Sequence, residues 1–313
     1  MKFKHKVRMF RDFGFRVGFS SACSSALRYP MALTRWKDRC ILDFLREKYS
    51  GIIQNHRQSH LQEVLTAEPP AVWSVWWQGE DNAPELVKMC FAAINAHRGA
   101  HPFRIITRDN FTDYIDLPEH ITRKVQEGTI TLTHLSDIIR FYLLARYGGL
   151  WLDATILPVR DIPEEIYSYD YYVIRHAENP YSYGVNRDRW ISFLQAAKKE
   201  NPLCKFGYDF LAEYWKEQNT LIDYMLIDYA LELAYQEFPE YVRFLDDVPL
   251  NNPEVDSLRP ILNDEWDSQK FAALSGATDF FKLTYKHVLR KESAGRETFY
   301  GHLLASVQKH TRP

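Results

Sequence analysis

The sequence predicts an α/β fold: a mostly parallel sheet flanked by helices, with a helical N-terminal arm and a mostly helical C-terminal half. Three observations carry this prediction. From residue 71 onward, short apolar runs alternate with segments of helical periodicity, the pattern of strands joined by right-handed crossovers. Glu68-Pro69-Pro70 separates this region from what precedes it. Residues 1–60 carry thirteen Lys/Arg against four Asp/Glu, although the whole chain has a net charge of −2. We therefore expect a basic helical arm, residues 1–65, and an α/β domain, residues 66–313.

The arm alternates basic residues with aromatic ones and then shows helical periodicity over residues 35 to about 65. Its first part contains Phe3, Phe10, Phe13, Phe15 and Phe19. A cationic segment with aromatic side chains can attach to an anionic membrane surface. An ordinary helical lead-in that packs on the body explains the same pattern, and both can hold. The longest uncharged run, residues 17–27, is too short and too rich in serine to span a bilayer.

The four cysteines lie in no metal-ligand spacing, and no secretory leader is evident. This is typical of reduced thiols in a cytosolic protein. We expect a cytoplasmic protein, peripheral at the inner face of the cell membrane if the arm attaches there.

The elements of the body follow from local patterns. Residues 71–77 and 102–107 predict strands, and the helix between them opens with a proline in its first turn and runs to about residue 97. A short helix over 118–127 follows, and then a longer one that ends at Tyr147, with Thr133 or Ser136 as its cap. Further strands are expected over 150–157 and 171–176. Beyond these, helices are expected over 189–199, 203–218, 221–238 and 266–274, with a loop-like section at 246–264.

One stretch carries most of the functional information. Asp137 and Arg140 are spaced i, i+3 and share one side of the predicted helix, which Gly148-Gly149 ends. The next strand delivers Asp153 to its carboxyl end, where open α/β sheets bind ligands. A single Asp at a strand end is most often a structural cap or turn residue, so the combination carries the argument. The three side chains are expected to meet at one rim, which suits sugar hydroxyls and a diphosphate.

These segments resemble the sugar-nucleotide signature of glycosyltransferases with a GT-A fold and a DXD-type sugar-binding region. The resemblance is closest to the bacterial capsular polysaccharide synthesis proteins. It covers about residues 70 to 290 and rests on residues 76–79 (WWQG), 83–87, 134–140, 147–155, 221–224 and 282–286, with 35–38 (RWKD) also similar. It implies a GT-A-like hexosyltransferase that moves a sugar from a nucleotide-sugar donor to a capsular or cell-surface polysaccharide intermediate on a lipid, with retention of configuration.

The resemblance also implies roles for particular residues. Asp137 and Arg140 would hold donor hydroxyls, and Asp153 would contact ribose, sugar or a cation. An aromatic ring at the end of the first strand would stack on the base. Strand alternation sends Trp76 and Trp77 to opposite faces, so only one ring can stack, and we favour Trp77, beside Gln78; the alternative is that both rings are structural. A late basic element would close over the diphosphate through Lys282 and Lys286.

The chain departs from the DXD pattern because the second acid is replaced by Thr155. A hard divalent cation prefers carboxylate and phosphate oxygens. Two alternatives stay open. In one, Asp153 holds Mn²⁺ or Mg²⁺ together with the diphosphate, water and another carboxylate. In the other, no metal is used, and Lys282, Lys286 or Arg140 offsets the charge of the diphosphate.

Three further groups are site candidates, the first two with two interpretations each. His134 could line the same rim, or serve as an ordinary cap or packing residue. Asp223 could orient an acceptor hydroxyl or act as a base, with Asp228 beside it, but solvent-exposed helix acids are the more common case. His176 and Glu178 follow a strand where acceptors approach in GT-A folds, by analogy only.

Two other classes of function compete with a transferase. A catalytically silent subunit could bind a nucleotide sugar or glycan in the same pocket, which the missing second acid favours, and a membrane-associated scaffold would need no pocket. There is no Walker or GxGxxG phosphate loop and no recognisable nucleic-acid module, and the acidic body would repel a nucleic-acid backbone.

Overall fold

The structure, a computed structural model, describes residues 2–27, 30–57, 59 and 68–310, with residues 2–6, 309 and 310 as backbone only. A five-stranded sheet of order β2-β1-β3-β6-β5 forms its centre. β1 pairs in parallel with β2 and β3, while β6 is antiparallel to its neighbours, so four strands share one direction. The predicted α/β fold with a mostly parallel sheet is confirmed. The strands are β1 (Val72–Val75), β2 (Phe103–Ile106), β3 (Gly149–Leu152), β5 (Tyr171–Ile174) and β6 (Ile191–Ala197).

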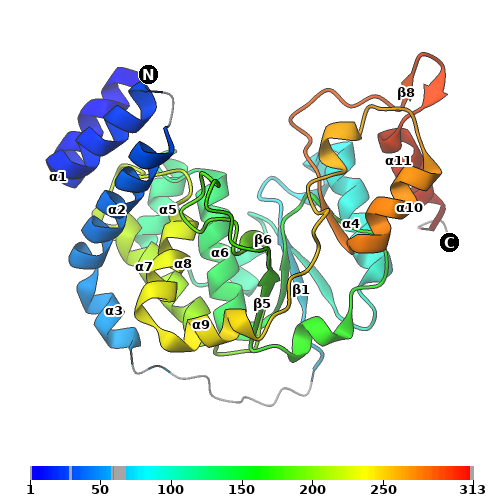
Figure 1. Ribbon diagram of the computed structural model, residues 1–313. Coiled ribbons are helices and arrows are strands. Elements are labelled where there is room, and N and C mark those ends of the chain that lie inside the picture. Colours follow the sequence, from blue (N-terminus) through cyan, green and yellow to red (C-terminus); the bar gives the residue numbers. More distant parts are fainter. Residues whose placement is uncertain (1, 28–29, 58, 60–67, 311–313) are drawn as a thin grey trace.

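Helices cover both faces of this sheet (Figure 1). Side chains alternate along each strand, so Trp73 and Trp151 join the core under α6 to α8, whereas Val72 and Leu150 join the core under α4. α10 and α11 lie beside α4 on that second side. The helices of the body are α4 (Glu85–His97), α5 (Glu119–Gln126), α6 (Leu132–Tyr147), α7 (Pro202–Glu217), α8 (Leu226–Glu237), α9 (Pro239–Asp246), α10 (Ser268–Ala277) and α11 (Phe299–His310).

The arm is helical, as predicted, and consists of α1 (Lys2–Ala26), α2 (Met31–Lys48) and α3 (Ser50–His56). α1 is broken at Gly14, whose φ of 78° interrupts the helix. Ile41 and Leu45 of α2 are buried in the same core as α6 and α7. The expected helical periodicity up to residue 65 and the boundary at residues 65 and 66 extend into positions 60–67, which lie outside the described residues, as does the Phe3 side chain.

The prediction of a helix over residues 189–199 is wrong, because residues Ile191–Ala197 form strand β6. The sequence Leu194-Gln195-Ala196-Ala197 is rich in helix formers, and it lacks the alternation of a half-buried strand. β6 nevertheless lies between β3 and β5 and forms hydrogen bonds with both. Pairing on both sides therefore overrides local propensity.

Three further boundaries differ from those expected. The strand predicted over 150–157 is interrupted after Leu152, and β4 (Ile156–Pro158) pairs with β7 (Phe280–Lys282) in a separate two-stranded sheet. α6 is capped by Thr131 rather than by Thr133 or Ser136. The helix predicted from residue 221 begins later, at α8. A hairpin of β8 (Glu292–Ser293) and β9 (Arg296–Glu297) precedes α11.

Within the described part of the chain, no helix is both long and apolar enough to cross a membrane. All four cysteines are free thiols; Cys40, Cys90 and Cys204 are buried and Cys23 is partly buried.

Candidate active site

A cleft of about 680 Å³ opens where β1 and β3 end. α6 provides one wall, and its start is fixed because the Thr131 hydroxyl accepts a hydrogen bond from the His134 backbone N–H. Asp137 and Arg140, one turn apart on this helix, both line the cleft. Asp153 directly follows β3, and a turn in which Ile156 N–H donates to the Asp153 carbonyl leads into β4.

Arg140 links two carboxylates. Its Nη2 lies 2.9 Å from Asp153 Oδ1 and 3.4 Å from Asp137 Oδ1. Its Nη1 donates to the Ser192 carbonyl of β6 at 2.6 Å, and the guanidinium lies 5.1 Å from the Trp151 ring. The guanidinium is thus held in one orientation by a strand, a ring and two acids.

Asp153 receives hydrogen bonds on both carboxylate oxygens. Trp151 Nε1 donates to Oδ1 at 2.9 Å, and Lys282 Nζ donates to Oδ2 at 2.7 Å. Lys282 reaches this position because β7 pairs with β4 and places Lys282 opposite Ile156. The separate small sheet therefore brings a distant cation to the end of β3.

Burial and charge act differently on the two acids of the cleft. Burial, opposed by Arg140 and reinforced by Asp153, raises the pKa of Asp137 to about 7. Burial would also raise the pKa of Asp153, but Lys282 and Arg140 outweigh it and hold that pKa below its ordinary value. Asp153 is therefore ionised at neutral pH, whereas Asp137 is close to its midpoint and can also donate a hydrogen bond.

Both tryptophans at the end of β1 line the cleft, together with Gln78. Alternation separates them as expected: Trp76 packs toward the α4 side and Trp77 toward the α6 side. The Trp76 ring meets Tyr285 edge-on at 5.5 Å, and the Trp77 ring lies 5.1 Å from Phe111. Each ring is partly exposed, so stacking of Trp77 on a base stays a prediction.

The remaining predicted residues lie at different depths. Lys286 lines the cleft from the bend after β7. His134 is buried behind the wall, 3.7 Å from Asp137 and beside the Trp215 and Tyr224 rings, and burial lowers its pKa to about 4. It does not line the cleft and is neutral at pH 7.

Asp223 and Asp228 are placed differently from the solvent-exposed helix acids considered above. Asp223 precedes α8, does not line the cleft, and accepts from Lys37 Nζ at 2.8 Å. Asp228 lies inside α8 and is buried; burial, reinforced by Asp137, raises its pKa to about 7. Neither contacts the open volume directly. His176, hydrogen-bonded to the Asn252 carbonyl, and Glu178, paired with Arg187, are also outside the cleft lining.

Several lining residues were not named as site residues from the sequence. They come from loops or short elements far apart along the chain: Phe193, Tyr224, Met225, Arg259, Tyr285 and His287. Arg259 lies in η4 (Arg259–Ile261), inside the section read as loop. Residues 221–224 and 282–286 belonged to the quoted motifs, and these were the available hints for Tyr224 and Tyr285.

The donor set around Asp153 does not fit a divalent cation. Both oxygens already accept from nitrogen donors, and the nearby acid Asp137 is paired with Arg140. Among the residues that the structure describes, no group of three Asp, Glu, His or Cys side chains could hold a metal ion. Thr155 lines the cleft but offers only a neutral hydroxyl.

Fold and site together define an α/β protein with a cation-bearing cleft at the carboxyl ends of parallel strands, where such sheets bind their ligands. Residues 31–303 match the capsular polysaccharide synthesis protein family. The chain therefore belongs to this family, as its motifs predicted. The match begins at the first residue of α2, so it includes Arg35-Trp36-Lys37-Asp38.

Individual relatives are more distant. The chain is similar to "O-glycosyltransferase braB" of Annulohypoxylon truncatum, with 26% identity over 164 residues, which are 46% of this chain and 37% of that protein. The chain thus spans little more than a third of the length of this relative. Two solved structures have a TM-score of 0.40. One is a PaToxG glycosyltransferase, with 13% identity; the match covers 78% of this chain and 94% of that chain. The other is the WbbM bifunctional glycosyltransferase, with 11% identity; the match covers 79% of this chain and 51% of that chain.

Proposed function

We propose that this protein is a glycosyltransferase that moves a sugar from a nucleotide-sugar donor to a capsular or cell-surface polysaccharide intermediate, on a GT-A-like core. One observation carries the proposal: Arg140 is held between Asp137 and Asp153 on the rim of a cleft that also contains Lys282 and two tryptophans. Membership of the capsular polysaccharide synthesis family supports it.

In this proposal the donor lies along the α6 wall. Asp137 and Arg140 bind sugar hydroxyls, and a protonated Asp137 can donate a hydrogen bond to a sugar oxygen. Asp153 orients Arg140 and Lys282. The base stacks on Trp77 or Trp76, as a flat indole allows.

The departing diphosphate is neutralised by side chains rather than by a metal. Lys282, Lys286 and Arg259 all line the cleft, and fixed cations can stabilise charge that develops on a leaving group. The occupied oxygens of Asp153 favour this alternative over the metal-bound one, because a cation would have to displace both Lys282 and Arg140.

We propose that transfer retains the anomeric configuration. Inversion needs a base that deprotonates the acceptor. The two carboxylates among the described lining residues, Asp137 and Asp153, are both paired with Arg140, so an inverting reaction would have to use another lining base such as His287. Proton NMR of the first-formed product, read at its anomeric centre, tests this point.

The acceptor is proposed to be lipid-linked at the inner face of the membrane, with α1 attached to the surface. Met9, Phe13 and Val17 bury one side of α1, while Phe15 is 70% and Phe19 is 44% exposed beside the exposed Arg16. Aromatic rings and cations on one exposed segment suit an anionic bilayer. Cosedimentation with phosphatidylglycerol vesicles should fall for Phe15→Ser/Phe19→Ser, and phosphatidylcholine vesicles should bind weakly throughout.

A thermal-shift screen of nucleotide sugars with and without Mn²⁺, followed by donor hydrolysis and transfer assays, tests the function. A ligand that binds only the folded state raises the melting temperature. Turnover that is lost in Arg140→Ala supports the transferase. Tight binding of a nucleotide sugar without turnover, whichever metal ion is added, would instead establish the catalytically silent subunit. If no nucleotide sugar binds, the membrane-associated scaffold is the alternative that stands.

A further inference from the structure

One part of the cleft wall depends on an irregular loop. Residues 218–225 connect α7 to α8 and carry Tyr224 and Met225, which line the cleft with Leu132 of α6. Their exposed fractions are 60%, 42% and 39%. These apolar surfaces line the same cleft as Arg140. A loop without regular hydrogen bonds needs other contacts to hold such a wall in place.

Lys37 of α2 supplies one of these contacts. Its Nζ lies 2.8 Å from Asp223 Oδ2, while Asp223 Oδ1 accepts from the Met225 backbone N–H at 3.0 Å. One carboxylate therefore ties the arm to the backbone of the wall. Nearer the start of the same loop, the Thr220 hydroxyl donates to Asp12 of α1 at 2.5 Å.

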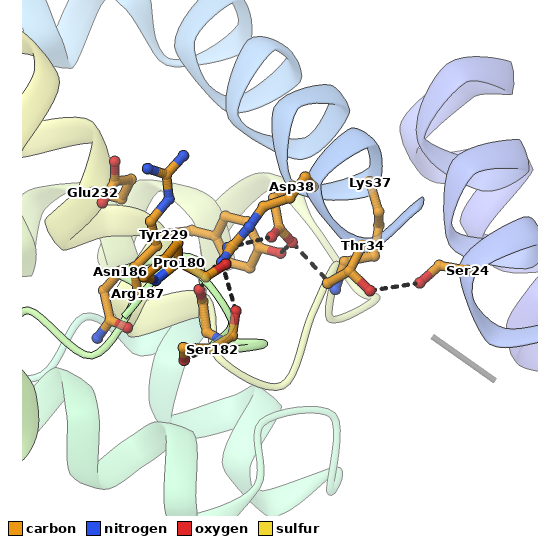
Figure 2. Close-up of polar contacts among 12 residues, drawn as sticks. Ser24, Thr34, Lys37, Asp38, Pro180, Ser182, Asn186, Arg187, Tyr229 and Glu232 are labelled. Atoms are coloured by element: carbon orange, nitrogen blue, oxygen red, sulfur yellow. Dashed lines mark hydrogen bonds and ion pairs between the residues drawn. The ribbon is translucent and has the colours of Figure 1, made fainter. Parts of the chain in front are cut away.

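Asp38, the next residue of α2, extends the contact to the start of α8. The Tyr229 hydroxyl donates to Asp38 Oδ1 at 2.6 Å, and Lys37 Nζ lies 3.5 Å from the same oxygen. Figure 2 shows Asp38 and Tyr229 together between α2 and α8. Tyr229 stands one helical turn after Met225, so the wall is held at both its loop and its helix end.

Arg35 connects the same helix to a second loop. Its guanidinium donates to the carbonyls of Gly184 at 2.9 Å and Ser182 at 2.5 Å, and it lies 3.7 Å from Asp38. That loop continues to Asn186, whose side-chain amide lies 3.5 Å from buried Asp228. Figure 2 shows Pro180 and Ser182 beneath α2 in this arrangement.

The four charged side chains of this network balance one another. Lys37 and Arg35 face Asp38 and Asp223, and all four side chains are at most about a fifth exposed. Desolvated ion pairs hold a geometry tightly, because breaking one strands a buried charge. We call these four residues the α2 brace.

We propose that the α2 brace positions the Tyr224–Met225 wall as part of the acceptor subsite, and that Lys37 acts on the reaction through Asp223. Asp223 is then a positioning residue whose carboxylate is committed to Lys37 and to the loop backbone, not a base. The proposal rests on the transferase function proposed above. It makes the arm a component of the active site from residue 35 onward, and the arm helps to select the acceptor without touching the donor.

The test separates acceptor from donor kinetics. The donor is the nucleotide sugar found in the thermal-shift screen, and the acceptors are a panel of p-nitrophenyl hexopyranosides, with water as the smallest acceptor. Lys37→Met should raise the acceptor KM about tenfold, because a wall displaced by a fraction of an ångström orients the acceptor poorly, and leave the donor KM within about twofold. Lys37→Arg, which keeps the charge, should restore most of the acceptor KM.

A double-mutant cycle tests the route through Asp223. If Lys37 acts through Asp223, the double variant Lys37→Met/Asp223→Asn should have nearly the same acceptor KM as Lys37→Met alone. Lys48→Met is the matched control, because Lys48 is also on α2 but pairs with Glu217 on the surface, at 3.0 Å. The proposal would be overturned if the change in acceptor KM of the double variant equalled the product of the two single changes. Equal changes in donor KM and acceptor KM would overturn it as well.

Hydrogen–deuterium exchange of the peptide covering residues 219–226 gives a readout that needs no substrate. Exchange should be faster in Lys37→Met and unchanged in Lys48→Met, with a native melting transition retained in both. Unchanged exchange in Lys37→Met would refute the brace. If the wild type neither binds nor turns over any nucleotide sugar, the proposed function fails, and the exchange result alone decides whether the brace exists.

Discussion

Two charged clusters in this molecule have the same composition. The cleft cluster contains Arg140 and Lys282 with Asp137 and Asp153, and the α2 brace contains Arg35 and Lys37 with Asp38 and Asp223. In each case two cations face two carboxylates.

The clusters differ in what else their members contact. Arg35 donates to the carbonyls of a loop, and the Tyr229 hydroxyl donates to Asp38. The charged groups of the brace are therefore bonded to other protein groups rather than facing a cleft. Arg140 has a single carbonyl partner, and its cluster lines an open cleft. Charge composition alone therefore does not distinguish a ligand site from a structural brace; the competing protein partners do.

The largest expected effect is the loss of donor turnover when the cleft cluster is broken. Arg140→Ala removes the group proposed to orient the donor and takes the cation away from Asp137, while Asp153 keeps Lys282, so donor turnover should fall about 10³-fold. Arg35→Ala, in the brace, should leave donor hydrolysis within about threefold, because it touches no donor group. Steady-state hydrolysis of the donor measures both, with exposed Arg146→Ala on α6 as the control. Equal losses in Arg140→Ala and Arg35→Ala would erase the distinction between the clusters.

The next effect measures how tightly the brace is closed. Tyr229→Phe removes a buried hydrogen bond to a carboxylate and should cost about 1.5–3 kcal/mol in the free energy of unfolding. Urea denaturation measures this. Tyr241→Phe is the control, because the Tyr241 hydroxyl is buried without a hydrogen-bond partner among the described residues. A loss in Tyr241→Phe as large as that in Tyr229→Phe would show that the hydroxyl bond to Asp38 is not the cause.

The third effect is a pH dependence of the cleft cluster. The folded-state pKa of Asp137, about 7, is above the ordinary value of about 3.9, so between these pH values the folded protein holds a proton that the unfolded chain has released. This contribution to stability is present at low pH and is lost as pH rises through 7. Asp153 stays charged and His134 stays neutral over most of this range, whereas buried Asp228, whose pKa burial and Asp137 also raise to about 7, titrates together with Asp137.

Asp137→Asn should therefore gain in melting temperature relative to the wild type when the pH is raised from 5 to 7.5. Melting curves at several pH values measure the difference. A difference that stays constant, or that changes in the opposite direction, would show that Asp137 is ionised throughout.

The smallest expected effect concerns metal ions. If Lys282 and its neighbours offset the diphosphate charge, EDTA should change the initial rate by less than about twofold. Lys282→Met should then lower the rate far more than chelation does. Activity abolished by EDTA and restored by Mn²⁺ would reinstate the metal-bound alternative.

Local motifs were sufficient to predict the part of the site that α6 and the end of β3 contribute. Asp137, Arg140 and Asp153 lie within 17 residues of one another, and a helix, a glycine pair and a strand fix their relative positions. The parallel strands were predictable from local sequence as well, because each contains a short apolar run.

The other half of the site depends on long-range pairing that no local pattern reveals. Arg259 and the Tyr224–Met225 wall reach the cleft through loops, and β6 forms only because β3 and β5 flank it on both sides. Lys37 and Asp223 are 186 residues apart, and no local pattern linked the 35–38 motif to the helix acid Asp223. Their neutralisation of one another inside the fold became visible only in three dimensions.

The glycine pair before β3 has a consequence at a distance. A Cβ at Gly149 would stand 2.2 Å from the Ala71 carbonyl oxygen, the atom that accepts the Leu150 N–H and joins β3 to β1. From Gly149 to Asp153 the chain is a buried strand of about 13 Å. A single methyl group at the start of β3 would therefore displace the cleft rim at the other end of the same strand, where Asp153 lies.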